Sequence, residues 1–108
     1  MGSATVEVSG VDAAQWAAEL RATLVSKARP GDNVSSVELQ RSPELVVAVI
    51  GLVFAGAQTA KTIWDWWHSH RPEGITVTIL VSDGTQVDVS VVSEAELEIV
   101  FQRAVSRR

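Results

Sequence analysis

Apolar and polar residues alternate along four stretches of the chain, and this alternation predicts four β-strands. In each stretch one row of side chains is apolar and the other is polar, which is typical of a sheet with one face against a core and the other in water. In the second stretch, for example, Val37 and Leu39 face one way while Glu38 and Gln40 face the other. The four predicted strands cover residues 4–9, 34–41, 75–81 and 87–91.

The last two strands are predicted to form a hairpin around the dipeptide Asp83-Gly84. A two-residue turn at this dipeptide would place the apolar rows of the two strands on opposite faces of the sheet. A three-residue loop over residues 82–84 instead pairs Ile79 with Val87, so that both apolar rows share one face. Glycine at the last loop position also suits a type I turn followed by a bulge. We therefore predict the three-residue loop.

Capping patterns predict the first and last helices. Asp12 with Gln15 forms a capping-box pattern at the start of a helix that runs to about residue 28. Ser93 with Glu96 forms a second capping box, which opens the final helix. The predicted buried stripe of the final helix consists of Leu97, Val100, Phe101, Ala104 and Val105.

A long central helix is predicted over residues 43–70. Ser42 is a suitable N-cap, Pro43 suits the first helical position, and Pro72 ends the helix. Its first part, LVVAVIGLVFAGAQTA over residues 45–60, contains no charged residue. A helix on the surface of a small domain normally has one polar face. Since packing on a sheet covers only one side of this helix, the rest of its apolar surface needs another cover.

Three ways of shielding this apolar surface from water are compatible with the sequence. The first and last helices could flank the long helix and bury it. A protein partner, including another copy of the chain, could pack against it, since Gly51 and Ala55 are small residues four positions apart and would permit close approach of two helices. Finally, the helix could enter a membrane, although residues 45–60 fall short of the roughly 20 apolar residues of a typical span.

Three tryptophans near the end of the predicted helix bear on the same question. On a helix Trp64 and Trp67 share one side, whereas Trp66 points away from them. They cannot all enter one core, so at least one should be exposed or lie at an interface, where tryptophan often contributes strongly to binding. Alternatively, a partly exposed tryptophan merely covers the helix end.

Taken together, the elements predict a single α+β domain over residues 1–108, with a core over about 4–105. The predicted order is β-α-β-α-β-β-α. The fold class is a two-layer α+β arrangement with a four-stranded, mainly antiparallel or mixed sheet. Because every predicted strand has one polar row, the helices are expected to cover a single face.

Composition excludes several kinds of function. The chain has no cysteine, so disulfides, thiolate catalysis and cysteine-ligated metals are absent. The formal net charge is −4 and no basic cluster is dense enough to neutralise a run of phosphates, which argues against a nucleic-acid partner. The first eight residues lack the basic and apolar regions of a secretory signal, so we expect a cytoplasmic protein.

The polar side chains do not form a convincing catalytic or metal site. The two histidines, His68 and His70, are two positions apart and diverge on a helix, so they cannot chelate one metal as an i, i+4 pair would. Asp65 with His68 could hold a weakly bound metal, but no third ligand is evident. Ser69 lies between the histidines, and neighbours along a helix do not face one another. We predict neither a cofactor, a metal nor an enzymatic activity; a small hydrolase that uses Asp65, Ser69 or His68 is the disfavoured alternative.

Several features in order along the chain resemble a family of small bacterial domains. They are Ser-Pro-Glu-Leu at residues 42–45, the apolar helix, Trp-Asp-Trp-Trp at 64–67 with a basic end, Thr-Val-Thr-Ile at 76–79, Asp-Gly-Thr-Gln-Val-Asp-Val at 83–89, and Leu97 in the final helix. Over roughly residues 6–105 the chain resembles the effector-associated constant component family, stand-alone domains common in actinobacteria. The resemblance implies a non-enzymatic component encoded beside effectors such as proteases and NTPases, in systems regarded as conflict or antiviral defence modules.

We therefore expect an adaptor or scaffold that contacts an effector protein, a protease or NTPase encoded nearby, and that self-associates as a homo-oligomer through the helix over 43–70. A membrane-associated protein that uses residues 45–60 is the alternative. The hypothetical interface residues are Gly51, Phe54, Ala55, Trp64, Trp66 and Trp67.

Overall fold

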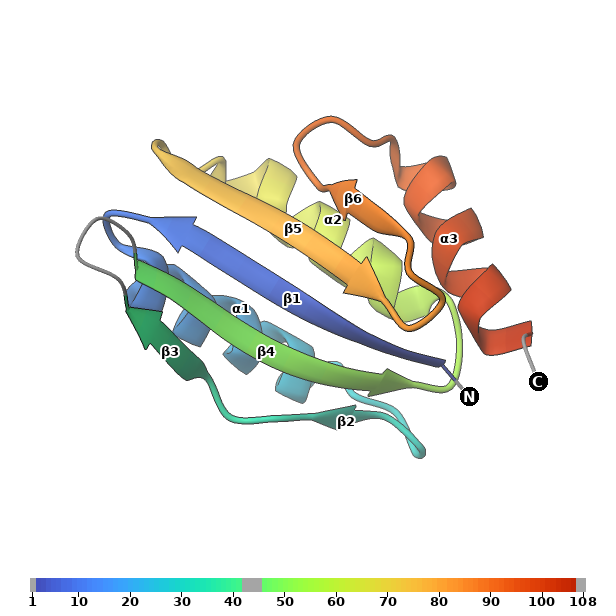
Figure 1. Ribbon diagram of the computed structural model, residues 1–108. Coiled ribbons are helices and arrows are strands. Elements are labelled where there is room, and N and C mark those ends of the chain that lie inside the picture. The colour runs from blue at the N-terminus through green and yellow to red at the C-terminus, as the bar shows by residue number, and fades with distance from the viewer. Residues whose placement is uncertain (1, 42–45, 107–108) are drawn as a thin grey trace.

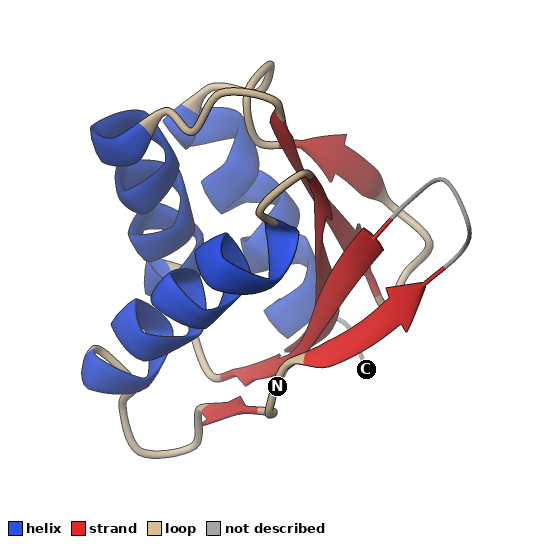
Figure 2. Cartoon of the chain, turned by 90° about the vertical axis from the view of Figure 1, so that its left-hand side faces the viewer, coloured by secondary structure: helices blue, strands red, loops and turns tan. Residues whose placement is uncertain are grey.

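A computed structural model describes residues 2–41 and 46–106, and this part of the chain forms three helices and six strands in two layers. The helices lie together on one side of the sheet (Figures 1 and 2), which confirms the α+β class and the one-sided arrangement predicted from the strand pattern. In chain order the elements are β1 Gly2–Gly10, α1 Ala13–Ser26, β2 Asn33–Val34, β3 Glu38–Arg41, β4 Val46–Phe54, α2 Gln58–His70, β5 Ile75–Val81, β6 Gln86–Asp88 and α3 Glu94–Ser106.

The sheet is antiparallel and has β1 at its centre. Its strand order is β2-β4-β1-β5-β6, and β3 pairs with the same edge of β4 as β2 does. β1 is hydrogen-bonded along its length to β4 on one side and to β5 on the other. The prediction of a four-stranded sheet was wrong because the longest partner of β1, the strand β4, was taken for a helix.

The long helix predicted over 43–70 exists only in its second half. Residues Val46–Phe54 form β4, and the helix α2 begins at Gln58. Five of the nine β4 residues are valine or isoleucine, whose branched side chains favour a pleated sheet over a helix. The helix start predicted at Ser42 and Pro43 falls on residues 42–45, outside the described residues.

The strand predicted over 34–41 is divided in two by a bulge. Val34 pairs with Leu52 in β4 and Glu38 pairs with Val49, so three residues of one strand lie opposite two of the other. The extra residue reverses the alternation of side chains between β2 and β3. As a result Val34 faces the helices, whereas Glu38, four positions later, lies on the outer face with Val49.

The predicted hairpin and the last capping box are both confirmed. Ile79 pairs with Val87, as expected for a three-residue loop, and Gly84 has a φ of +95° in the turn. At the start of α3 the Glu96 N–H donates to the Ser93 hydroxyl at 3.1 Å, and the Ser93 N–H donates to a Glu96 carboxylate oxygen at 3.4 Å. The box predicted for Asp12 does not form, because its side chain makes no capping hydrogen bond.

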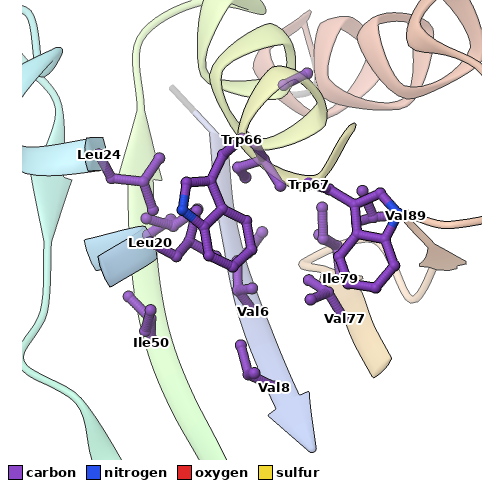
Figure 3. Close-up of a cluster of buried hydrophobic side chains, with 14 of the residues drawn as sticks. Val6, Val8, Leu20, Leu24, Ile50, Trp66, Trp67, Val77, Ile79 and Val89 are labelled. Carbon is purple, nitrogen blue, oxygen red and sulfur yellow. The ribbon is translucent and has the colours of Figure 1, made fainter. Parts of the chain in front are cut away.

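The core lies between the sheet and the helix layer. β1, β4 and β5 each contribute one row of buried apolar side chains to it, and α2 contributes Trp66 and Trp67. In Figure 3, Trp66 lies on the side of Leu20 and Leu24 from α1, while Trp67 lies on the side of Ile79 and Val89. The two adjacent tryptophans therefore both enter the core, one on each flank of α2.

Candidate interface on the outer face of the sheet

The sheet face opposite the helices carries one row of side chains that departs from the usual polar pattern. β1 presents Ser3, Thr5, Glu7 and Ser9 outward, as an antiparallel sheet with a solvated face normally does. β4 pairs with β1 so that its own outward positions are Val47, Val49, Gly51 and Val53. β4 is thus apolar on both faces, and we call its outward positions the valine row.

The valine row is only partly shielded by the neighbouring strands. Val47 and Val49 are half-buried, whereas Val53 is 36% exposed. Leu80 of β5, on the same face, is 43% exposed. In the described part of the chain all three helices lie on the other face (Figure 2), so no helix covers these side chains.

A shallow depression of about 690 Å³ lies at one end of this face, where Gly51 leaves the valine row without a side chain. Val53 and Leu80 border it on two strands, and Thr5, which pairs with Gly51, lies between them. Four hydroxyl and amide side chains also line the depression, together with apolar residues of the strands: Ser3, Asn33, Ser35 and Ser82. It is open and shallow, which suits a protruding side chain of a partner better than an enclosed small molecule.

Carboxylates flank the valine row. Glu38 of β3 and Glu7 of β1 both pair with Val49, one on each side, and Glu7 pairs on its other side with Thr78. Thr78 in turn pairs with Asp88 of β6. One line across five strands therefore contains two carboxylates with a valine between them and a third carboxylate at its end. None of these three carboxylates forms a salt bridge among the described residues.

A second depression, of about 310 Å³, lies between the loop after α1 and the first half of α2. Its charged lining is largely engaged already. Asp32 accepts the N–H of Ala55 at 2.9 Å and that of Arg29 at 3.0 Å. Lys61 contacts Asp65 at 3.3 Å and Glu94 of α3 at 3.0 Å. These bonds hold a loop and two helices together.

The side chains considered for catalysis have separate structural partners. His68 stacks on Trp64 with ring centroids 3.8 Å apart, and His70 is bonded through Nδ1 to the carbonyl of Trp66 at 2.8 Å. Asp65 pairs with Lys61. Across residues 2–41 and 46–106 no three histidine or acidic side chains lie close enough to hold a metal ion. Among the described residues, no hydrogen bond or ion pair joins His68, His70 and Asp65 to one another.

The structure separates the six residues predicted for the interface. Gly51 lies in the valine row, and Ala55, just beyond it, is exposed. Trp64 is half-buried and donates its indole N–H to the Val92 carbonyl at 3.2 Å. The remaining three, Phe54, Trp66 and Trp67, are buried in the core of the chain itself. These three are therefore not available to a partner in this fold.

Val47, Val49 and Val53 are candidate interface residues that were not predicted from the sequence. They were assigned to a helix, where they do not lie in one line. The signal that could have found them is the same one that identifies β4, a run of branched residues in which both alternate rows are apolar.

No helix in the described ranges has the length and apolar character required to cross a membrane. The membrane alternative rested on a helix over 45–60, and most of that segment is a strand of the sheet. Comparisons of the chain with models of protein families, with curated proteins and with solved structures found no match.

Proposed function

We propose that this chain is a protein-contact component that uses the outer face of its sheet, and that it acts as a non-enzymatic adaptor or scaffold in a bacterial effector system. The observation that carries the first part is the valine row of β4, which lies between the polar outward rows of β1 and β3. The resemblance to the effector-associated constant component family supports the second part and points to a cytoplasmic effector, a protease or NTPase encoded nearby, as the partner.

Without a partner, the valine row leaves apolar side-chain surface in contact with water. Burying a branched aliphatic side chain completely stabilises a protein by about 1.5–3 kcal/mol relative to leaving it exposed. Val53 and Leu80 are partly exposed in the isolated chain. Burying them against a partner would therefore add a substantial part of that stabilisation. An apolar row bordered by polar rows has the composition of a protein interface.

Self-association through a helix over 43–70 loses its basis, because the apolar part of that segment is β4. A homo-oligomer would have to use the valine row instead. The membrane alternative is not carried forward, since it rested on the same helix.

The test is co-expression with the proteins encoded beside its gene, followed by purification and light scattering. In the double variant Val49→Thr, Val53→Thr, each valine is replaced by a residue of similar shape and strand preference, so the fold should persist. The matched control is Val25→Thr on α1, 48% exposed on the other side of the molecule. We expect the double variant to lose the complex and the control to keep it. A wild-type chain that is strictly monomeric and co-purifies with none of these proteins would contradict the proposal.

A further inference from the structure

The charge of the outer face limits what can dock on it. From the line of residues Glu38, Val49, Glu7, Thr78 and Asp88 we infer that the valine row binds a protein surface on which aliphatic side chains are flanked by lysine or arginine, rather than a second copy of this chain. This inference rests on the proposed function and specifies the chemistry of the partner.

The spacing of the carboxylates carries the first step. Neighbouring strands are about 4.8 Å apart, so Glu7 and Glu38, which are two strands apart, have backbones about 10 Å from one another with Val49 between them. Glu7 is half-buried among its neighbours, and Glu38 is exposed. Any surface that covers Val49 must also approach both carboxylates.

In the second step, the described strand residues of this face offer these carboxylates no cation. Among strand residues whose side chains the structure describes, the outward positions include the three carboxylates and neither lysine nor arginine. A carboxylate that loses water without gaining a partner is strongly destabilised. A docking surface must therefore supply positive charge on both sides of the valine that it covers.

A second copy of the chain cannot supply that charge through the same face. In a two-fold arrangement with its axis at Val49, the valine row would meet its own counterpart, and Glu7 and Glu38 would meet the same carboxylates of the other copy. With the axis elsewhere on the row, the outward strand positions described for the other copy still include no lysine or arginine to meet them. Like charges across an interface oppose association. Nucleic acid and anionic lipid are excluded for the same reason, because their phosphates would face the carboxylates. A basic protein surface satisfies both the apolar row and its acidic borders.

The probe for the test is a short β-hairpin peptide with valine and lysine alternating on one face. Two further hairpins serve as comparisons, one with glutamate in place of lysine and one with serine in place of valine. Binding is followed by NMR through the backbone amide shifts of the wild-type chain. We expect the valine–lysine hairpin to shift residues of β1, β3 and β4, and each comparison hairpin to bind at least about tenfold more weakly.

The variants Glu7→Gln and Glu38→Gln, combined, test the carboxylates directly. We expect the double variant to bind the valine–lysine hairpin about tenfold more weakly than wild type, and added salt to weaken wild-type binding. The control is Glu19→Gln on α1, an exposed carboxylate in the other layer, which should bind as wild type does. Equal binding of the lysine and glutamate hairpins, shifts confined to the helices, or a wild-type dimer formed through the valine row would each overturn the inference.

The two proposals fail in different ways. If the Glu7→Gln, Glu38→Gln variant retains the complex that the Val49→Thr, Val53→Thr variant loses, the charge inference is wrong and the contact function stands. If no neighbouring gene product binds and the wild-type chain is monomeric, the contact function itself is wrong.

Discussion

Ser35 and Gly51 exchange two hydrogen bonds across the edge of the sheet. The Gly51 N–H donates to the Ser35 hydroxyl at 2.7 Å, and the Ser35 N–H donates to the Gly51 carbonyl at 2.9 Å. Ser35 lies in the bulge between β2 and β3, where regular strand pairing with β4 is interrupted. Its side chain therefore takes the place of a missing backbone acceptor, and the three residues of the bulge fit opposite two residues of β4.

This pair predicts that Ser35→Ala destabilises the fold by about 1 kcal/mol, because the Gly51 N–H loses its protein acceptor and must bond to water at an exposed edge. For a domain of about 100 residues that corresponds to a fall in Tm of about 4–6 °C. Urea unfolding followed by circular dichroism measures it. Ser36→Ala is the control, because the Ser36 side chain has no bonding partner in the described residues. Equal midpoints for the two variants would show that the Ser35 hydroxyl contributes nothing.

The same edge illustrates what sequence could and could not predict. Within the stretch 34–41 the alternation of Glu38, Leu39 and Gln40 was predicted correctly, because alternation within a short strand follows directly from the pleat. The bulge was not predicted, since an extra residue in a polar, serine-containing loop leaves no mark on the pattern of apolar positions. The hairpin register at Ile79 and Val87 was predicted because a slip there would have exposed a whole apolar row.

The incorrect prediction of a helix over residues 46–54 has a physical cause as well. A continuous apolar run is compatible with a buried helix or with a buried strand, and periodicity alone does not separate them. Its branched residues favoured a strand, but the run continues through residues 55–57 to the start of the helix α2 without a charged residue. Because this segment is a strand and not a helix, the candidate interface also changes. Gly51 is on the surface, but Phe54 is in the core.

Phe54 and Val53 provide a direct test of that placement, because they lie on opposite faces of β4. The Phe54 ring stacks on Phe101 of α3 with centroids 4.5 Å apart. Phe54→Ala should lower the free energy of unfolding by about 3–5 kcal/mol, and Phe54→Leu by less. Val53→Ala should change it by less than about 1 kcal/mol, since Val53 is already exposed. Denaturant unfolding measures these free energies for the three variants. If Phe54→Ala were as stable as wild type, the position of Phe54 in the core would be contradicted.

The ion pairs of Lys61 predict that the stability of the folded state decreases at alkaline pH. Its hydrogen bonds to Glu94 and then Asp65, together with their charges, raise the pKa of the Lys61 ammonium above 10.5. A group whose pKa is raised by folding stabilises the folded state at pH values below its unfolded pKa, and this contribution disappears as the pH rises through the folded pKa. Because Lys61 is exposed, the effect is small and sensitive to salt.

The measurement compares the Tm of wild type with that of Lys61→Met from pH 7 to pH 12. We expect wild type to melt higher by a constant margin up to about pH 10, and the margin to vanish above the pKa of Lys61. Lys27→Met is the control, because Lys27 has no ion pair in the described part of the chain. A margin that persists unchanged at the highest pH would mean that packing of the lysine stem, rather than its charge, joins α2 to α3.

Asp32 connects the loop after α1 to the end of β4 through two hydrogen bonds. Two variants that remove one or both acceptor oxygens can measure how much these bonds contribute to stability. One carboxylate oxygen accepts the Ala55 N–H and the other accepts the Arg29 N–H. Asp32→Asn keeps one acceptor oxygen, whereas Asp32→Ala keeps none. We expect losses of about 1 kcal/mol for the asparagine variant and about 2 kcal/mol for the alanine variant, in that order. Asp12→Ala, at an exposed residue without a capping bond, should lie near wild type.

Hydrogen exchange at the Ala55 amide separates a local role for Asp32 from a general loss of stability. If the carboxylate holds the end of β4 in place, exchange at Ala55 should accelerate in Asp32→Ala by more than exchange at Val6 in the central strand, because only the edge would open locally. Equal acceleration at both amides would mean that the variant unfolds as a whole and that Asp32 does not fix this edge. Since Val53, the outermost residue of the valine row, lies two positions before Ala55, local opening there should also weaken partner binding in Asp32→Ala while Asp12→Ala binds normally.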